Sequence, residues 1–186
     1  MKVLICANAL IGDSTTLGMP TKSYAKWQED RIDALAVALR RAVENGVEKC
    51  FILGGLFGAG FVPQHLLDDT TAEIEACELP VVYLPYPGED QVASAAMKLP
   101  PNLKVVQQNA ALFNLDLVNG CEVQVQREDE ISVSWKGDEG KKTVQLGNLE
   151  PVGFNESRPT GFLAVDIVGG VCRGSGVGQS CRASFR

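Results

Sequence analysis

Side chains that could take part in chemistry gather in three short segments, each of which directly follows an apolar run. These segments are Ala7–Asp13 (ANALIGD), Gly54–Gly58 (GGLFG) and Pro85–Asp90 (PYPGED). Ligands of open α/β sheets bind at the carboxyl ends of the parallel strands, so we expect the three segments to meet at one edge of a sheet. Any functional site of this protein is expected there.

Four oxygen-bearing side chains in these segments could hold one hard cation. They are Asn8, Asp13, Glu89 and Asp90. A single Mg²⁺ or Mn²⁺ ion can be bound by one or two carboxylates together with water molecules. The competing interpretation is that the carboxylates are solvated, or that Glu89 and Asp90 stabilise the positive end of a helix that begins there.

The inventory of nucleophiles and bases argues against other common forms of catalysis. His65 is the only histidine, and it lies in the first turn of an expected helix, where a surface or capping position is the simplest interpretation. No GxSxG segment is present, so a serine hydrolase is not indicated. The glycine-rich stretch Gly54–Gly60 has neither GK[ST] nor GxGxxG, so tight turns are favoured over a nucleotide-binding module, the third interpretation.

Six cysteines are spread along the chain without a CxxC pair: Cys6, Cys50, Cys77, Cys121, Cys172 and Cys181. This spacing supports neither a zinc knuckle nor a redox dithiol. Cys6 and Cys50 lie in or beside apolar strand patterns, and we expect them to be small buried hydrophobic residues. Cys172 and Cys181 lie in the C-terminal tail, where they would be open to oxidation or crosslinking in vitro.

Strand and helix patterns alternate before residue 110. The expected strands are Lys2–Ala7, Lys49–Leu53, Pro80–Leu84 and Lys104–Gln107, and the expected helices run from Ser23 to the Asn45-Gly46 stop, from Pro63 to Cys77 and from Glu89 to Met97. The apolar stripe of the first helix consists of Trp27, Ile32, Leu35, Leu39 and Val43. Three- and four-residue steps of this kind are typical of helices, and the alternation with strands indicates βαβ units.

The hydrophobic period changes to two beyond residue 110. Glu122–Gln126 and Ile131–Trp135 alternate apolar and polar residues, and Gly137–Gly140 is a turn that leads into Thr143–Leu146. These segments predict an antiparallel meander with one solvated face, and Phe162–Val168 is expected as a last strand. The predicted fold class is therefore α/β, with βαβ units forming a mostly parallel sheet, followed by an antiparallel β meander.

One domain is expected to span residues 1–168, a usual length for a single hydrophobic core. Residues 169–186 are rich in Gly, Ser and Arg and have almost no periodicity. Such a composition predicts a disordered tail. A small basic interaction tail is the alternative.

The charge of the chain limits its partners. The sequence has 17 Lys and Arg against 23 Asp and Glu, a formal net charge of −6 and a pI of about 4.9. No broad positive field is available, so strong nonspecific nucleic-acid binding is disfavoured. MKVLICANALIG is typical of a buried strand and not of a signal peptide, and no apolar run approaches the roughly 18 residues of a membrane span. We therefore expect no membrane association and a cytoplasmic location.

The order and setting of the three segments resemble the calcineurin-like metallophosphoesterases, and among them the SbcD-type DNA repair nucleases. The resemblance covers roughly residues 1–106 and, more faintly, 161–166. It rests on framework residues such as Gly54, the Leu56-Phe57 pair and Pro87-Gly88. It implies a trimmed metallophosphoesterase-like core.

The residues that would bind metal in such a site are replaced. By the resemblance, Asn8 stands at an aspartate position, Leu10 at a histidine position, Gly55 at the bridging aspartate, and Glu89 and Asp90 at an asparagine and the catalytic histidine. Two divalent ions about 3.5–4 Å apart need a bridging carboxylate and several nitrogen and oxygen ligands. Gly55 has no side chain and Leu10 no donor atom, so the sequence predicts that this site is degenerate and holds no metal.

We therefore expect a protein without catalytic residues or a cofactor, acting as a structural or regulatory binding subunit. The resemblance implies a link to DNA repair and an SMC-like ATPase as partner, and self-association through the first helix is the other option. The competing hypothesis is a weak or altered metal-dependent phosphodiesterase or nuclease. It would use one Mn²⁺ or Mg²⁺ ion at Asn8, Asp13, Glu89 and Asp90.

Overall fold

The computed structural model describes residues 1–13, 20–115, 117, 122–128, 130–137, 140–149, 162–168 and 171–178. Helices and strands alternate in the first half, in the order β1 (Lys2–Cys6), α1 (Thr21–Glu44), β2 (Lys49–Ile52), α2 (Gln64–Ala76), β3 (Val81–Tyr83), α3 (Glu89–Ala96) and β4 (Leu103–Val105). The described part of the second half contributes the strands β5 (Leu112–Leu115), β6 (Val123–Arg127), β7 (Ile131–Gly137), β8 (Gly140–Leu146), β9 (Phe162–Val168) and β10 (Val171–Gly178).

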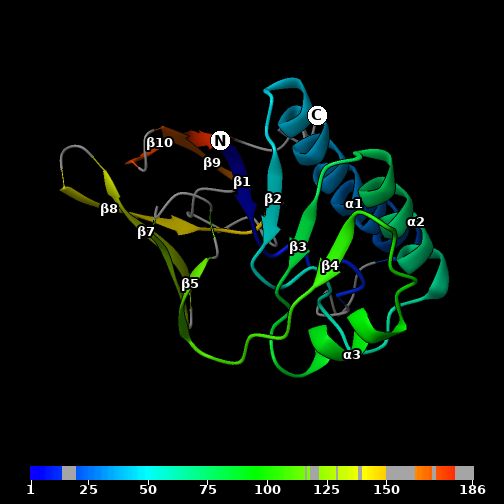
Figure 1. Cartoon of the computed structure of the whole chain (residues 1–186). Helices are drawn as coiled ribbons and strands as arrows, with labels where there is room; N and C mark the ends of the chain where they lie inside the picture. The colour runs from blue at the N-terminus through cyan, green and yellow to red at the C-terminus, as the bar shows by residue number, and fades with distance from the viewer. Residues whose placement is uncertain are drawn as a thin grey trace.

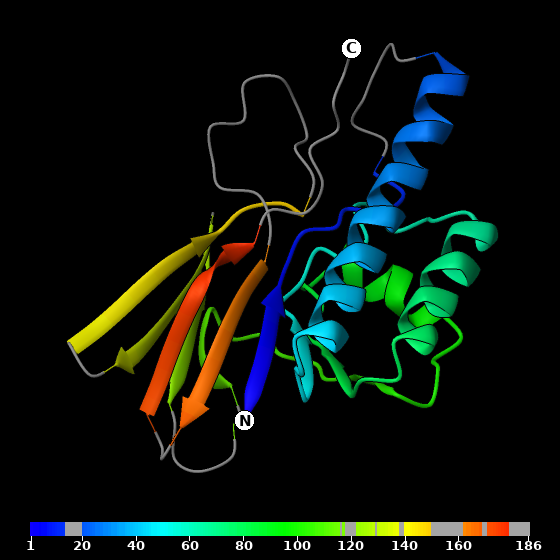
Figure 2. The same cartoon turned by 90° about the horizontal axis from the view of Figure 1, so that it is seen from above.

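The strands form two sheets. The larger sheet has the order β10-β9-β1-β2-β3-β4, in which β1 to β4 are parallel and β9 and β10 are antiparallel. The smaller sheet is antiparallel with the order β5-β6-β7-β8. Helices α1 and α2 cover one face of the larger sheet, and the smaller sheet covers the other face (Figures 1 and 2). The predicted fold class is confirmed.

Two apolar cores separate the three layers, and β1 contributes to both. Leu4 and Cys6 point into the core under the helices, whereas Val3 and Ile5 point into the core between the sheets. A parallel strand that is covered on both faces reads as a continuous apolar run, which is why β1 was recognisable in the sequence.

Helix α1 illustrates how sequence signals become structure. It ends at the predicted stop, where Gly46 adopts a left-handed φ of 67° and donates its N–H to the Val43 carbonyl. The middle of the predicted stripe is buried, but Val43 is 47% exposed and Trp27 is half-buried, so the stripe is not core along its whole length. No helix in the described part of the chain combines the length and apolarity needed to cross a bilayer.

The second half differs from the prediction in two strands, β5 and β10, which were not predicted. The predicted strand Phe162–Val168 is confirmed as β9, which pairs with β1 in the larger sheet. The expectation of disorder is wrong for Val171–Gly178, which forms β10 against β9. Strand pairing uses backbone groups and therefore needs no side-chain period, so a Gly-rich segment can extend a sheet. Cys172 in this strand is buried and disulfide-bonded. The rest of the predicted tail lies outside the described residues.

Candidate functional site

The first two predicted segments lie side by side and extend the pairing of β1 with β2. The N–H of Asn8 donates to the Gly54 carbonyl at 2.9 Å, that of Leu10 to Gly55 at 2.8 Å, and that of Ile11 to Leu56 at 3.0 Å. Asn8 and Leu10 both adopt left-handed backbone conformations with φ of 55°, which is uncommon outside glycine. The two loops are therefore joined through their backbones at the carboxyl edge of the larger sheet.

Two buried polar side chains of α1 hold the first loop from the helical side. Gln28 Oε1 accepts the N–H of Gly12 at 2.7 Å, and Gln28 Nε2 donates to the Asp13 carbonyl at 3.1 Å. Arg31 Nη1 donates to the carbonyls of Ala9 and Leu10 at 2.8 and 2.7 Å. The Arg31 guanidinium also lies 3.7 Å from the centre of the Trp27 ring. Backbone groups of the first loop are therefore hydrogen-bonded to side chains of α1.

Asn8 and Gly55, two of the positions assigned to a degenerate metal site, are in direct contact. A Cβ added to Gly55 would overlap the Asn8 Oδ1 and lie 3.0 Å from the Asn8 Cα. Gly55 also has a left-handed φ of 62°. This backbone therefore has no room for a carboxylate at position 55 while Asn8 keeps its present position.

Asp90, in the first turn of α3, joins the second loop to the third. Its carboxylate accepts backbone N–H groups from Gly55 at 2.9 Å, Phe57 at 3.1 Å and Tyr86 at 2.8 Å, and it also accepts the hydroxyl of Tyr83. The side chain is buried. A carboxylate has about four lone-pair sites, so these four donors saturate it and compensate for its burial.

The two tyrosines around Asp90 are held in their neutral forms. Burial raises the pKa of Tyr83 strongly, and the negative charge of Asp90 adds to this effect. Burial also raises the pKa of Tyr86 to about 12, with the nearby Arg127 opposing the shift. Neither tyrosine is therefore poised to act as a base near neutral pH.

Arg127 brings a positive charge from the smaller sheet to the carboxyl ends of β2 and β3. Its Nη1 donates to the carbonyls of Leu84 at 2.8 Å and Pro85 at 3.3 Å, and its Nη2 donates to the Gln108 carbonyl. Burial lowers the pKa of Arg127 from its usual value, although a guanidinium remains charged at any physiological pH. The charge is balanced by carbonyl dipoles and lies 5.3 Å from the Tyr86 ring centre.

The other predicted residues lie around the same edge, but they do not come together in one cluster. Asp13 is buried, and its Cβ lies against Gly58, where an added Cβ would overlap it. Leu10 is half-buried, and His65 is exposed on the first turn of α2. Glu89 is the first residue of α3, but its side chain is not among the described parts of the chain. Among the described residues, no group of three or more His, Cys, Asp or Glu side chains is placed to hold a metal ion.

Comparison with known proteins assigns no family. No protein-family model matches the chain, and no curated protein matches its sequence significantly.

Sequence reasoning missed the residues that organise this edge most directly: Gln28, Arg31, Tyr83 and Arg127. Gln28 and Arg31 precede Ile32 and Leu35 at helical spacing, so their place on the buried face could have been found. Arg127 follows Val123 and Val125 at the period of a strand, which puts it on the same inward face. A charged side chain on an otherwise apolar face was the signal available in the sequence. It could not reveal the hydrogen-bond partners of that side chain, because these lie far away along the chain.

Proposed function

We propose that this protein is a noncatalytic, metallophosphoesterase-like binding subunit with a structural or regulatory role. The observation that supports the proposal most is the Asp90 carboxylate, whose four acceptor sites are taken by Tyr83 and three backbone N–H groups. A carboxylate used in this way cannot ligate a cation without leaving buried donors unsatisfied, which costs about 1–3 kcal/mol for each group. The contact between Asn8 and Gly55 supports the same conclusion.

The donors of the glycine-rich loop are also in use, which argues against a nucleotide site. Phosphate-binding loops point several free backbone N–H groups at the anion. Here the N–H groups of Gly55 and Phe57 donate to Asp90, and that of Gly58 donates to the Ile11 carbonyl. The Asp90 carboxylate occupies the position that a bound anion would take at this loop.

The partner in this proposal is another protein or a second copy of the chain. The formal net charge of −6 disfavours a nucleic acid as the direct ligand. The sequence resemblance makes the proposal more specific: the partner would be an SMC-like ATPase, and the protein would take part in DNA repair.

A cytoplasmic location is also part of the proposal. Cys6, Cys50 and Cys77 are free thiols, as expected in a reducing compartment, whereas the disulfide at Cys172 is more typical of oxidising ones. Mass mapping of thiols blocked in rapidly quenched cells tests this point. A reduced Cys172 in the cell supports the cytoplasm, and an oxidised Cys172 contradicts it.

Hydrolysis assays with Mn²⁺ test the absence of catalysis. We expect the purified protein to hydrolyse neither bis-para-nitrophenyl phosphate nor single-stranded DNA above the rate of buffer with Mn²⁺. Calorimetric titration of Mn²⁺ should show no tight binding. The competing one-ion enzyme predicts both activity and binding.

Two variants separate true activity from contamination. Asn8→Ala and Glu89→Ala remove ligands of the competing site and leave the Asp90 carboxylate and its four donors in place. Activity that is lost in these variants while their circular dichroism spectra are unchanged would overturn the proposal. Activity that is equal in all three proteins belongs to a contaminant and leaves the protein noncatalytic. Asp90→Ala is unsuitable as the main test, because loss of structure would also abolish activity.

A further inference from the structure

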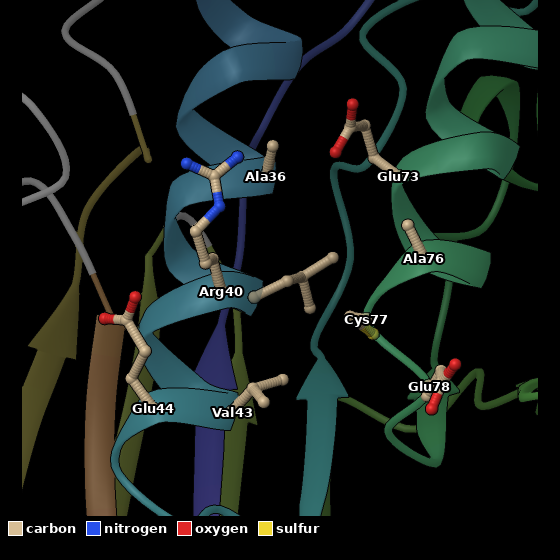
Figure 3. Close-up of a pocket in the computed structure, with 9 residues that line it drawn as sticks. Ala36, Arg40, Val43, Glu44, Glu73, Ala76, Cys77 and Glu78 are labelled. Atoms are coloured by element: carbon tan, nitrogen blue, oxygen red, sulfur yellow. The ribbon is translucent and has the colours of Figure 1, made fainter.

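A groove of about 290 Å³ lies between the C-terminal halves of α1 and α2 (Figure 3). Its lining residues are Ala36, Leu39, Arg40, Val43 and Glu44 on α1, and Glu73, Ala76, Cys77 and Glu78 at the end of α2. Helices α1 and α2 end directly before β2 and β3 begin. The groove is therefore at the opposite edge of the sheet from the candidate functional site.

The groove has an apolar floor. Leu39 is fully buried at its base, and Ala36, Val43, Ala76 and Cys77 complete the apolar lining. Val43 continues the apolar stripe of α1 but remains 47% exposed. An apolar side chain placed here would cover this surface, and burial of apolar area is the main source of affinity in helix-in-groove recognition.

The rim of the groove is acidic. The charged residues that line the groove are Glu44, Glu73 and Glu78 and the single cation Arg40, which gives a net charge of −2. In Figure 3, Arg40 and Glu73 lie on opposite walls. No ion pair within the described part of the chain includes either of them. The rim charges are therefore available to a ligand.

Helix α2 adds to this negative potential in a way that weakens the helix itself. Its carboxylates are Asp68, Asp69, Glu73 and Glu75, and it contains no Lys or Arg. The C-terminus of a helix carries a partial negative charge, where cations stabilise and anions destabilise. The end of α2 has no basic residue in its last turn, and Glu78 follows directly. A cation bound in the groove would be stabilised by both the carboxylates and the helix dipole.

We propose that this groove binds a basic amphipathic segment of a partner protein. An apolar side chain of that segment packs on Val43 and Ala76, and its Lys or Arg side chains pair with Glu73 and Glu78. This inference rests on the proposed function, because it names the class of partner that a noncatalytic binding subunit would take. The negative rim excludes nucleic acid and anionic lipid as occupants.

Fluorescence anisotropy with a labelled peptide tests the proposal. The probe is a helical peptide of Leu and Lys with all Leu residues on one face, and the control peptide has the same composition with Leu and Lys mixed around the helix. We expect saturable binding of the amphipathic peptide, roughly tenfold tighter than the control peptide, with affinity falling as salt is raised. Equal binding of the two peptides, or no binding, would overturn the proposal.

Matched charge variants locate the binding site. Glu73→Lys and Glu78→Lys change the rim, whereas Glu75→Lys makes the same change in net charge at an exposed position of α2 outside the groove. We expect each rim variant to weaken binding roughly tenfold and Glu75→Lys by less than about threefold, since a side chain outside the groove makes no close ion pair with the bound segment. Equal losses in all three variants would mean a diffuse field and no specific groove.

A second pair of variants tests the apolar floor at constant charge. Val43→Ser removes apolar surface in the groove, and Val92→Ser removes it from an exposed position of α3. Binding should weaken roughly three- to tenfold in the first variant and remain unchanged in the second. Equal affinity of Val43→Ser and the unmodified protein would contradict apolar anchoring.

Cys77 provides a readout that needs no substitution. It lines the groove and is partly exposed, whereas Cys6 and Cys50 are fully buried. The amphipathic peptide should slow the modification of Cys77 by maleimide, measured by mass mapping, and the control peptide should not.

If sedimentation instead shows a dimer that Glu73→Lys dissociates, the occupant is a second copy and the proposal of a partner segment is wrong. Mn²⁺-dependent hydrolysis with intact peptide binding would overturn only the proposed function, and absence of both would overturn only this inference.

Discussion

The guanidinium of Arg127, the last residue of β6, donates a hydrogen bond of 2.8 Å to the carbonyl of Leu84, which directly follows β3. The bond joins the two sheets, because β6 and β3 belong to different ones. A fixed cation from the smaller sheet thus neutralises carbonyl dipoles at the edge where ligands of α/β proteins bind. At this edge the protein's own side chains take up the backbone groups that a ligand could otherwise bind.

Removal of this cation should destabilise the protein. Arg127→Met keeps much of the apolar volume but leaves the buried carbonyls of Leu84 and Pro85 without their donor. We expect the free energy of unfolding to fall by about 3 kcal/mol, measured by urea denaturation. Lys136→Met, at an exposed position of β7, is the control and should change stability by less than about 0.5 kcal/mol. Equal small effects would show that Arg127 contributes little to the docking of the sheets.

The charge of Asp90 should matter as much as its shape. Asp90→Asn preserves size but turns an NH₂ group toward backbone donors. The contact with the Phe57 N–H becomes repulsive in one orientation of the amide, and the contacts with the Gly55 and Tyr86 N–H groups become repulsive in the other. We expect a loss of about 2–4 kcal/mol in urea denaturation. Asp69→Asn, exposed on α2, supplies the comparison and should be nearly neutral. A stable Asp90→Asn protein would mean that the carboxylate is not the element that holds the two loops together.

Alkaline pH should weaken the fold through the buried tyrosines. The pKa of Tyr86 is raised from 10.0 to about 12 by burial, and that of Tyr83 is raised by burial and by Asp90. The folded state therefore holds these protons more tightly than the unfolded chain does. Both contributions to stability are complete below pH 10 and begin to fall as the pH rises through 10. That of Tyr86 is lost by about pH 12, and that of Tyr83 continues to fall at higher pH.

Urea midpoints measured between pH 8 and 11.5 check this expectation. The midpoint should fall above pH 10 in the unmodified protein. Tyr86→Phe has no proton to lose and should show a shallower decline. Parallel declines in the two proteins would assign the alkaline effect to other groups.

Parts of the fold were readable from the sequence because their signals are local. The strand Lys49–Ile52 is a short apolar run, and α1 has a helical stripe and a glycine stop. Strand β10 was missed because its pairing with β9 is made by backbone atoms. The site was only half predictable. The segments that meet could be listed, but the role of Asp90 depends on N–H groups that only the folded loops bring to it.

The acidic end of α2 should be a site of easy stabilisation. Glu75→Lys replaces an exposed anion in the last turn with a cation and reverses an unfavourable interaction with the helix dipole. We expect a gain of about 0.3–1 kcal/mol at low ionic strength, reduced by salt, in thermal or urea unfolding. Lys26→Glu, near the start of α1, would not share this gain, since it also removes the exposed ion pair with Asp30. A loss of stability in Glu75→Lys would contradict the electrostatic account of α2.

The contact between Asn8 and Gly55 can be isolated with a matched pair of glycines. Gly55 and Gly46 have similar backbone angles, with φ of 62° and 67°, but no heavy atom lies within 4 Å of a Cβ built on Gly46. Gly46→Ala should therefore show only the cost of a left-handed alanine, about 1–2 kcal/mol. Gly55→Ala should lose that amount and a further 1–3 kcal/mol from overlap with Asn8.

A double variant separates the overlap from the backbone strain. Asn8→Gly removes the Oδ1 atom that an added Cβ would meet and suits the left-handed φ of residue 8. In the background of Asn8→Gly, the cost of Gly55→Ala should approach that of Gly46→Ala, although the close approach to the Cα of residue 8 persists. A double-mutant cycle with urea denaturation gives the coupling energy. Additive costs would show that Asn8 moves aside freely, and a carboxylate could then be introduced at position 55 without changing residue 8.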